Sequence, residues 1–326
     1  MNTPVKSLSN LLKSSLKRVE IEISKNIKDE EKLITLTAGH LIKAKGKKIR
    51  PLLTLIVSKM LNYKGNADVT LAVCIEFIHN ATLLHDDVID ASNQRRGKQT
   101  ANALWGNEAS VLVGDFLFAR AFELMVETND IWVLEKLSLA AAQITEGEVK
   151  QMSMQGQPDS QKSDYFSVIK GKTGVLFAAA AQTGSKVGKG NNDLCEAFYN
   201  YGLALGNAFQ IMDDALDYGA SDGQIGKDLG DDFSEMKVTL PIILAWHDST
   251  VEERKFWERT FRAGKQKEGD FQKAKEIIAK YDCIERALDY AKVEVEKAIN
   301  SISGIPSSSL KDALVEAAKF ACLRDN

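Results

Sequence analysis

Apolar residues recur at helical spacing along almost the whole chain, and no stretch shows the sustained alternation of a β-strand. With only five prolines in 326 residues, the helices can be long. Turn-forming sequences such as NYKGNAD and GQPDS separate the apolar segments. The pattern predicts helices over residues 8–26, 30–44, 50–62, 68–90, 107–128, 131–155, 163–184, 192–218, 237–247, 252–262, 268–302 (with a break near 281) and 308–323.

The arrangement of these segments predicts one all-α domain over residues 1–326. The chain contains no internal repeat, low-complexity tract or long linker. Two segments, LAVCIEFIHNATLL (71–84) and YNYGLALGNAFQIM (199–212), are apolar on more than one face. Because a helix that is apolar all round is buried by its neighbours, we expect both in the middle of a large helical bundle.

Composition narrows the classes of function and the compartment. The chain is 44% hydrophobic and 27% charged with a net charge of −3, which argues against nucleic acid as a partner. Four well-separated cysteines indicate reduced thiols in a cytosolic protein. No apolar run approaches the ~18 residues of a membrane span. The basic N-terminus could be a transit peptide, but its helical spacing favours a first helix. We therefore expect a cytoplasmic location.

Both central apolar segments end in the same acidic pattern, D-D-x-x-D. The first is DDVID at residues 86–90 and the second is DDALD at residues 213–217. Acids at positions i and i+4 share one helix face and destabilise it by ~0.2–0.5 kcal/mol per pair. Acids at a helix C-terminus also oppose the macrodipole. One such motif could be a solvated helix end, but two at the ends of core helices favour cation binding.

The donor type indicates which cation is bound. Carboxylates alone suit hard cations, and Mg²⁺ takes only one or two of them before water and substrate phosphate complete its octahedron. The EF-hand spacing of a calcium loop is absent. Basic residues near the motifs can hold phosphate directly, and they are Lys47, Arg50, Arg95, Arg96, Lys172 with Thr173, Lys227 and Lys237. The sequence thus predicts one diphosphate bound through Mg²⁺ and a second bound by lysine and arginine.

These motifs identify a family resemblance. KGKKIRP, EFIHNATLLHDDVIDASNQRRG, KTG, GNAFQIMDDALDY and GKDLGDDFSEMKVTLP occur in this order along the chain. In order and spacing the chain resembles the trans-isoprenyl diphosphate synthases, or polyprenyl synthetases, over essentially its full length. Terpene cyclases share one D-D-x-x-D but lack the second. The resemblance implies the isoprenoid synthase fold with a central apolar cavity, and a homodimer.

The resemblance also implies roles for individual residues. Asp86, Asp90, Asp213 and Asp217 would bind Mg²⁺, three ions in all, with Asp87 and Asp214 in support. Arg95, Lys172, Thr173, Gln210, Lys227 and Lys237 would hold an allylic diphosphate, farnesyl or geranyl. Lys47, Arg50, His79 and Arg96 would hold isopentenyl diphosphate. His79 could instead be a core histidine. His85 would support the acids, and Asp231 and Asp232 could reach a metal-bound water.

The implied reaction joins the two substrates. The resemblance implies that the diphosphate group of the allylic substrate leaves with Mg²⁺, that the double bond of isopentenyl diphosphate attacks the resulting allylic cation, and that the released diphosphate takes the proton. Short-chain members carry aromatic residues four and five positions before the first aspartate, whereas this chain has Thr82 and Ala81. These small residues favour a long product, such as an octaprenyl or decaprenyl quinone tail.

Three alternatives remain open at the level of sequence. Phe77 shares a helix face with Ala81 and could stop the product at geranylgeranyl, or the chain could be a farnesyl-forming member. It could also be a non-catalytic subunit of a heteromeric synthase, although such chains usually lose one aspartate motif and this one keeps both.

Overall fold

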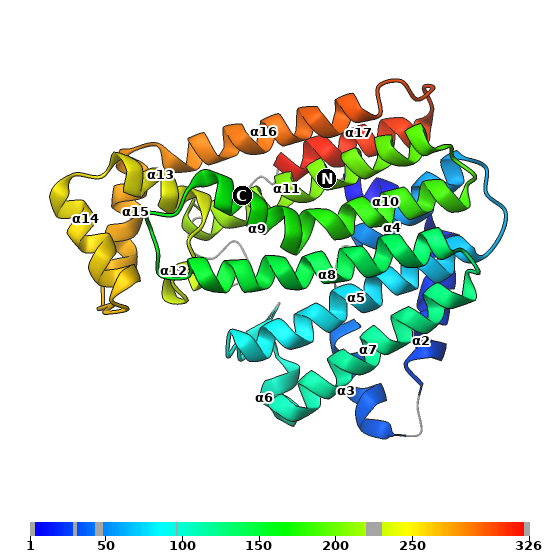
Figure 1. Cartoon of the computed structure of the whole chain (residues 1–326), viewed down its shortest axis with the longest axis horizontal. Coiled ribbons are helices and arrows are strands. Elements are labelled where there is room, and N and C mark those ends of the chain that lie inside the picture. Colours follow the sequence, from blue (N-terminus) through cyan, green and yellow to red (C-terminus); the bar gives the residue numbers. More distant parts are fainter. Residues whose placement is uncertain (1–3, 29–30, 43–47, 96, 220–229, 323–326) are drawn as a thin grey trace. The chain divides into compact units, whose positions relative to one another are not determined.

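The computed structural model describes residues 4–28, 31–42, 48–95, 97–219 and 230–322 (Figure 1). This part is helical apart from a hairpin of strands β1 (Gln94–Arg95) and β2 (Lys98–Gln99), so the predicted all-α class is confirmed. The α-helices are α1 (Pro4–Leu11), α2 (Lys13–Asn26), α3 (Lys32–Ile42), α4 (Ile49–Met60), α5 (Ala67–Ile89), α6 (Ala101–Trp105), α7 (Asn107–Glu127), α8 (Ile131–Met154), α9 (Lys162–Ile169), α10 (Val175–Val187), α11 (Asn192–Gly219), α12 (Asp231–Ser234), α13 (Leu240–Asp248), α14 (Val251–Trp257), α15 (Asp270–Lys280), α16 (Cys283–Ser301) and α17 (Ser309–Cys322). Two π-helical turns, η1 (Lys170–Gly174) and η2 (Glu258–Arg262), complete the set.

Some predicted helices are broken in the structure by a non-helical residue or by a π-helical turn. The segment 8–26 is two helices that meet at Leu12, whose side chain is fully buried. The segment 163–184 is interrupted by η1, and the short helices α6 and α12 were not predicted. The expected break near residue 281 is confirmed, since α15 ends at Lys280 and Asp282 adopts a positive φ of 51°.

Two compact units make up the chain. Unit 1 contains residues 1–141, 176–202 and 301–317, and unit 2 contains residues 142–175, 203–300 and 318–326. The expectation of one domain over residues 1–326 stays a prediction.

Helix α5 is the central helix of unit 1. It packs against α4 and along α7, which lies beside it in Figure 1. Fourteen of its side chains are buried, including Phe77 and Ala81, both with no exposed surface. Among the described residues, α5 alone has the length and composition of a membrane span, but 72% of its apolar window is buried inside the protein. Packing within unit 1 therefore accounts for its composition.

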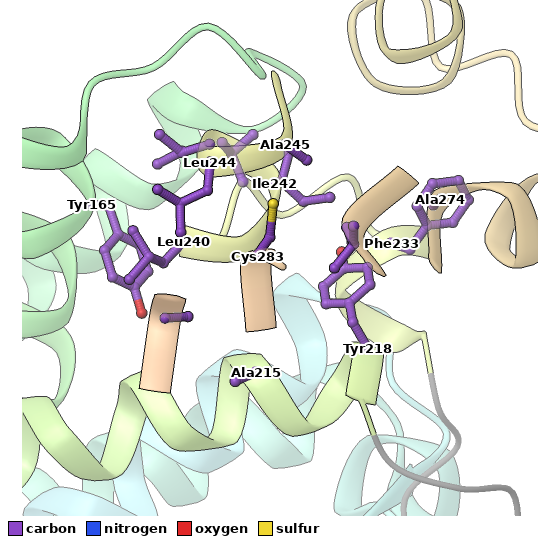
Figure 2. Packing of buried hydrophobic residues seen from close by; sticks show 14 of the residues in the cluster. Tyr165, Ala215, Tyr218, Phe233, Leu240, Ile242, Leu244, Ala245, Ala274 and Cys283 are labelled. Carbon is purple, nitrogen blue, oxygen red and sulfur yellow. The ribbon is translucent and has the colours of Figure 1, made fainter. Parts of the chain in front are cut away.

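An apolar cluster fills unit 2 around the end of α11. Ala215 and Tyr218 of α11 contribute to it, together with Tyr165 of α9, Leu240 of α13 and Phe233 of α12 (Figure 2). The cluster contains several aromatic rings in edge-to-face contact, such as Phe233 and Phe261 at 5.6 Å. Burial of large aromatic surfaces gives this region a rigid base. The second aspartate motif is built on that base.

Candidate active site

The first aspartate motif ends helix α5 in unit 1. Asp90 caps the helix, and its N–H donates to the carbonyl of Asp86 at 2.8 Å. Asp87 is only 1% exposed, whereas Asp86 and Asp90 are half-buried. The three acids therefore divide into an inward carboxylate and two that water or a ligand can reach.

Asp87 fixes the loop that follows the motif. Arg95, on β1, places its Nε 2.8 Å from Oδ1 of Asp87. Asn102 donates to the carbonyls of both Asp87 and Ser92 at 3.1 Å. Burial raises the pKa of Asp87, an effect that the Arg95 ion pair only partly offsets. Asp87 thus anchors Arg95 and the hairpin, consistent with a supporting role.

His85 contacts α7. Its Nε2 lies 3.2 Å from the Val111 carbonyl and 3.5 Å from Asp115. Gly114 makes room for the ring, because a Cβ on Gly114 would lie 2.2 Å from Nε2 of His85. These contacts tie the end of α5 to α7. The supporting role that we expected for His85 stays a prediction.

The residues predicted for isopentenyl diphosphate are only partly described. Arg50 and His79 are half-buried on the neighbouring helices α4 and α5. The Arg50 guanidinium carbon lies 4.5 Å from the ring centroid of Phe177, a cation–π contact that orients the side chain. Lys47 and Arg96 lie outside the described residues.

The second aspartate motif ends helix α11 in unit 2. Asp214 is 6% exposed and accepts two short hydrogen bonds, from Gln210 Nε2 at 2.7 Å and from the Tyr165 hydroxyl at 2.6 Å. Asp213 and Asp217 are half-buried. As in the first motif, the middle aspartate faces inward.

Asp217 holds the start of α12. Its two oxygens accept the backbone N–H groups of Gly230 and Asp232, each at 3.2 Å. Gly230 has a φ of 86°, a conformation that glycine adopts without strain.

Lys237 follows α12 and forms an ion pair with Glu235. Lys227 lies outside the described residues, and the roles expected for Asp231 and Asp232 stay predictions.

A π-helical turn presents Lys172 and Thr173. The turn η1 contains one residue more than an α-helical turn would, a feature that often marks functional sites. Thr173 donates to Gln210 at 2.8 Å. Lys172 Nζ lies 2.9 Å from Glu148 and 2.8 Å from Gln151 on α8. Glu148, Gln151 and Tyr165 were not among the residues predicted from the sequence, although the three-residue spacing of Glu148 and Gln151 places them on one face of a helix.

Two glycines allow the turn to approach α8. A Cβ on Gly147 would lie 2.6 Å from the Lys172 nitrogen, and one on Gly171 would lie 2.9 Å from the Gln143 carbonyl. Both neighbours are backbone atoms and cannot rotate away. The close crossing therefore depends on glycine and places Lys172 against Glu148.

We expect Gly147→Ala to destabilise the protein by about 1–3 kcal/mol, the usual cost of an overpacked site. Because the added methyl group displaces the turn, the KM for the allylic diphosphate should also rise. Denaturant unfolding and steady-state kinetics measure the two effects. Gly39→Ala in α3 is the matched control, since its Cβ meets nothing closer than 4.0 Å and alanine favours a helix. Equal stability changes in both variants would contradict the prediction.

The donor set fits the predicted Mg²⁺. Each motif offers two half-buried carboxylates four residues apart, and the middle carboxylate is held by protein donors. Among the described residues, no group of three or more acidic, histidine or cysteine side chains is arranged to enclose a metal ion. Mg²⁺ sites with few protein ligands are completed by water and substrate phosphate, as expected for carboxylate pairs of this kind.

Comparison with known proteins supports the family resemblance along nearly the whole chain. The polyprenyl synthetase family model matches residues 31–278. Octaprenyl diphosphate synthase of Escherichia coli is 38% identical over 98% of this chain and 99% of its own.

Solved structures of polyprenyl synthases also match this chain. A decaprenyl diphosphate synthase from Rhodobacter capsulatus has a TM-score of 0.94 at 41% identity, covering 98% of this chain and 99% of its own. A polyprenyl synthase from Caulobacter crescentus, solved with calcium and isoprenyl diphosphate, has a TM-score of 0.95 at 42% identity and covers 98% of both chains. The expected fold and prenyltransferase class are confirmed. The chain belongs to the polyprenyl synthetase family.

Proposed function

We propose that the protein condenses an allylic diphosphate, farnesyl or geranyl, with isopentenyl diphosphate in repeated trans additions to make a long-chain polyprenyl diphosphate. The observation that carries the proposal is the shared design of the two aspartate motifs. In each, the middle carboxylate is buried and bonded within the protein, while the flanking pair stays accessible on one helix face. The products named for the octaprenyl and decaprenyl relatives support the long chain.

The residues of the chain then have distinct tasks. Asp86, Asp90, Asp213 and Asp217 would hold three Mg²⁺ ions, which neutralise the charge on the leaving diphosphate when bound. Arg95, Lys172, Thr173, Gln210, Lys227 and Lys237 would bind the allylic diphosphate oxygens. Lys47, Arg50, His79 and Arg96 would bind isopentenyl diphosphate. The allylic C–O bond breaks, the double bond of isopentenyl diphosphate forms the new C–C bond, and a proton leaves to the released diphosphate.

The ion pairs of Lys172 and Lys237 in unit 2 indicate how these lysines would bind the diphosphate. Lys172 is held by Glu148, and Lys237 by Glu235. These acids keep each ammonium group ordered and partly neutralised in the absence of substrate. A diphosphate carries more charge than one carboxylate, so it can take over the lysine donors when it binds. Both lysines are therefore preorganised for an anion.

The length of the prenyl product is the more specific part of the proposal. Ala81 and Thr82 precede the first motif by five and four residues, about 7.5 and 6 Å below Asp86 along the helix. Ala81 is fully buried and Thr82 is half-buried. Neither side chain is bulky enough to stop a growing prenyl chain, which supports a product longer than geranylgeranyl and a role in quinone side chains. We propose a cytoplasmic enzyme that acts beside the membrane that accepts this product.

Product analysis tests the function. Purified protein receives labelled isopentenyl diphosphate and farnesyl diphosphate with Mg²⁺ or with EDTA, and the dephosphorylated products are separated by length. We expect Mg²⁺-dependent products longer than geranylgeraniol. A stop at geranylgeraniol would support the shorter-chain alternative. No elongation with either farnesyl or geranyl primer, beside an active control enzyme, would overturn the proposal and favour a partner-dependent subunit.

We also propose a homodimer, supported by an apolar stripe along the outer side of α7. Leu112, Phe122 and Val126 are 66%, 41% and 61% exposed, and Ala119 is exposed between them. Their spacing of three, four and seven residues places them on one helix face. Asp115, whose side chain is 65% exposed, interrupts the apolar surface on the same face. A second copy of α7 can cover this face by helix packing.

Leu112→Glu should raise the dimer dissociation constant by at least about 100-fold, because a symmetric interface carries the change twice. Light scattering during gel filtration over a concentration series measures it. Val251→Glu is the matched control, since Val251 is also 66% exposed but lies on α14. A Leu112→Glu protein that remains as dimeric as this control would refute the proposed interface.

A further inference from the structure

Tyr165 lies beneath the second aspartate motif and has no part in the roles proposed so far. It is 2% exposed, and its ring packs in the apolar cluster of unit 2 with Leu240. Figure 2 shows its hydroxyl end directed toward the helix that carries Ala215, which is α11. The hydroxyl donates to Oδ2 of Asp214 at 2.6 Å. A buried tyrosine thus supplies its only hydroxyl to an aspartate of the motif.

This hydrogen bond is the first in a chain of three that runs from Tyr165 to Thr173, called the relay below. Oδ1 of Asp214 accepts from Gln210 at 2.7 Å, and Oε1 of Gln210 accepts from Thr173 at 2.8 Å. Tyr165 and Thr173 belong to the same continuous segment, α9 followed by η1. The relay therefore fastens this segment to α11 at two places. Both oxygens of Asp214 are engaged by protein donors in this arrangement.

We propose that Tyr165 is a positioning residue for diphosphate binding through Mg²⁺. By holding Asp214, it fixes the rotation of the last turn of α11 and hence the direction of the Asp213 and Asp217 carboxylates. Through Gln210 it also fixes Thr173. This inference rests on the proposed function and assigns Asp214 to positioning instead of cation binding.

The physical reason lies in the buried carboxylate. Without the Tyr165 hydroxyl, Oδ2 of Asp214 would lose a short hydrogen bond in a site from which water is excluded. A buried charge that loses its donor is strongly destabilised, so the side chain would turn toward solvent or toward a cation. Either movement alters the face that Asp213 and Asp217 present.

Tyr165→Phe removes the hydroxyl and keeps the ring. We expect it to weaken binding of Mg²⁺ with inorganic pyrophosphate by about tenfold to a hundredfold, the usual loss for partners that orient metal ligands. Titration calorimetry measures this without turnover. In steady-state kinetics kcat should fall, while the KM for isopentenyl diphosphate stays unchanged.

Tyr201→Phe is the matched control. Tyr201 is also fully buried, and its hydroxyl donates to the Leu314 carbonyl at 2.8 Å, within unit 1. Both variants lose one buried hydrogen bond, so both should lose stability in thermal unfolding, but only Tyr165→Phe should lose pyrophosphate affinity. Equal affinities in Tyr165→Phe and wild-type protein would overturn the inference.

A second pair of variants decides the question even if Tyr165→Phe does not fold. Asp214→Asn retains an acceptor for Gln210 and a polar partner for Tyr165, so positioning predicts a much smaller loss of pyrophosphate affinity than in Asp213→Asn. Equal losses would make Asp214 a cation ligand and overturn the inference. A wild-type protein that elongates no substrate would instead refute the proposed function, so the two failures are distinguishable.

Discussion

Replacing Asp213 by asparagine should lower kcat/KM for the allylic diphosphate by at least about 10³-fold, which corresponds to ~4 kcal/mol of lost transition-state stabilisation. Asparagine keeps the size and one oxygen of the side chain but removes its negative charge. With Mg²⁺ held less firmly, the departing diphosphate would carry more uncompensated charge. Steady-state kinetics over a range of Mg²⁺ concentrations would show a low rate that added Mg²⁺ restores only partly.

An exposed aspartate provides the control for this effect. Asp289 on α16 is 69% exposed and pairs with Lys292 at 2.7 Å. Asp289→Asn removes the same charge from the protein and should leave the kinetics unchanged. If Asp213→Asn retained the wild-type rate, the second motif would have no role in binding the cation, and the proposed mechanism would fail.

Thr82→Phe should shorten the product. The fraction of products longer than geranylgeranyl should fall by at least about tenfold, a degree of discrimination typical of steric exclusion from an apolar pocket. Thr82 is half-buried, so the ring can enter accessible space without displacing the packed core. Separation of the dephosphorylated products by length measures the shift, while the rate of the first condensation should change little.

Two further variants separate blocking of the growing chain from general damage to α5. Ala81 is fully buried, so Ala81→Phe should shorten the product and also cost about 1–3 kcal/mol of stability by overpacking. Thr70 is a half-buried threonine of the same helix, about 120° round the axis from Thr82, and Thr70→Phe should leave product length unchanged. An unaltered product distribution in Thr82→Phe would mean that residues on another helix limit the length of the product.

The helices and the two motifs were predictable because both depend on short spacings along the chain. The apolar pattern correctly predicts long segments such as α5 and α11. The repeated acids are unfavourable at a helix end without a cation, so the occurrence of two such motifs predicts that they bind one. The resemblance of the full motif set to the polyprenyl synthetases predicted the family, which the family model confirms.

The partners of those residues were not predictable in the same way. Tyr165 and Asp214 are 49 residues apart and make a 2.6 Å hydrogen bond, and Lys172 and Glu148 are separated by 24 residues. The first pair depends on how α9 packs against α11, and the second on how η1 crosses α8. Nothing in the local sequence of Tyr165 distinguishes it from an ordinary core aromatic residue.

The sequence by itself determined the helical class and the family, and it predicted the chemical type of the site, because these follow from residue types at fixed local spacing. Only the tertiary structure decided which carboxylates of each motif face inward and which donors hold them. Asp87 and Asp214 are both middle residues of a D-D-x-x-D, but one is bound by an arginine and the other by a tyrosine and a glutamine. Burial and hydrogen-bond partners arise from packing between segments distant in sequence, and packing assigns different tasks to chemically identical aspartates.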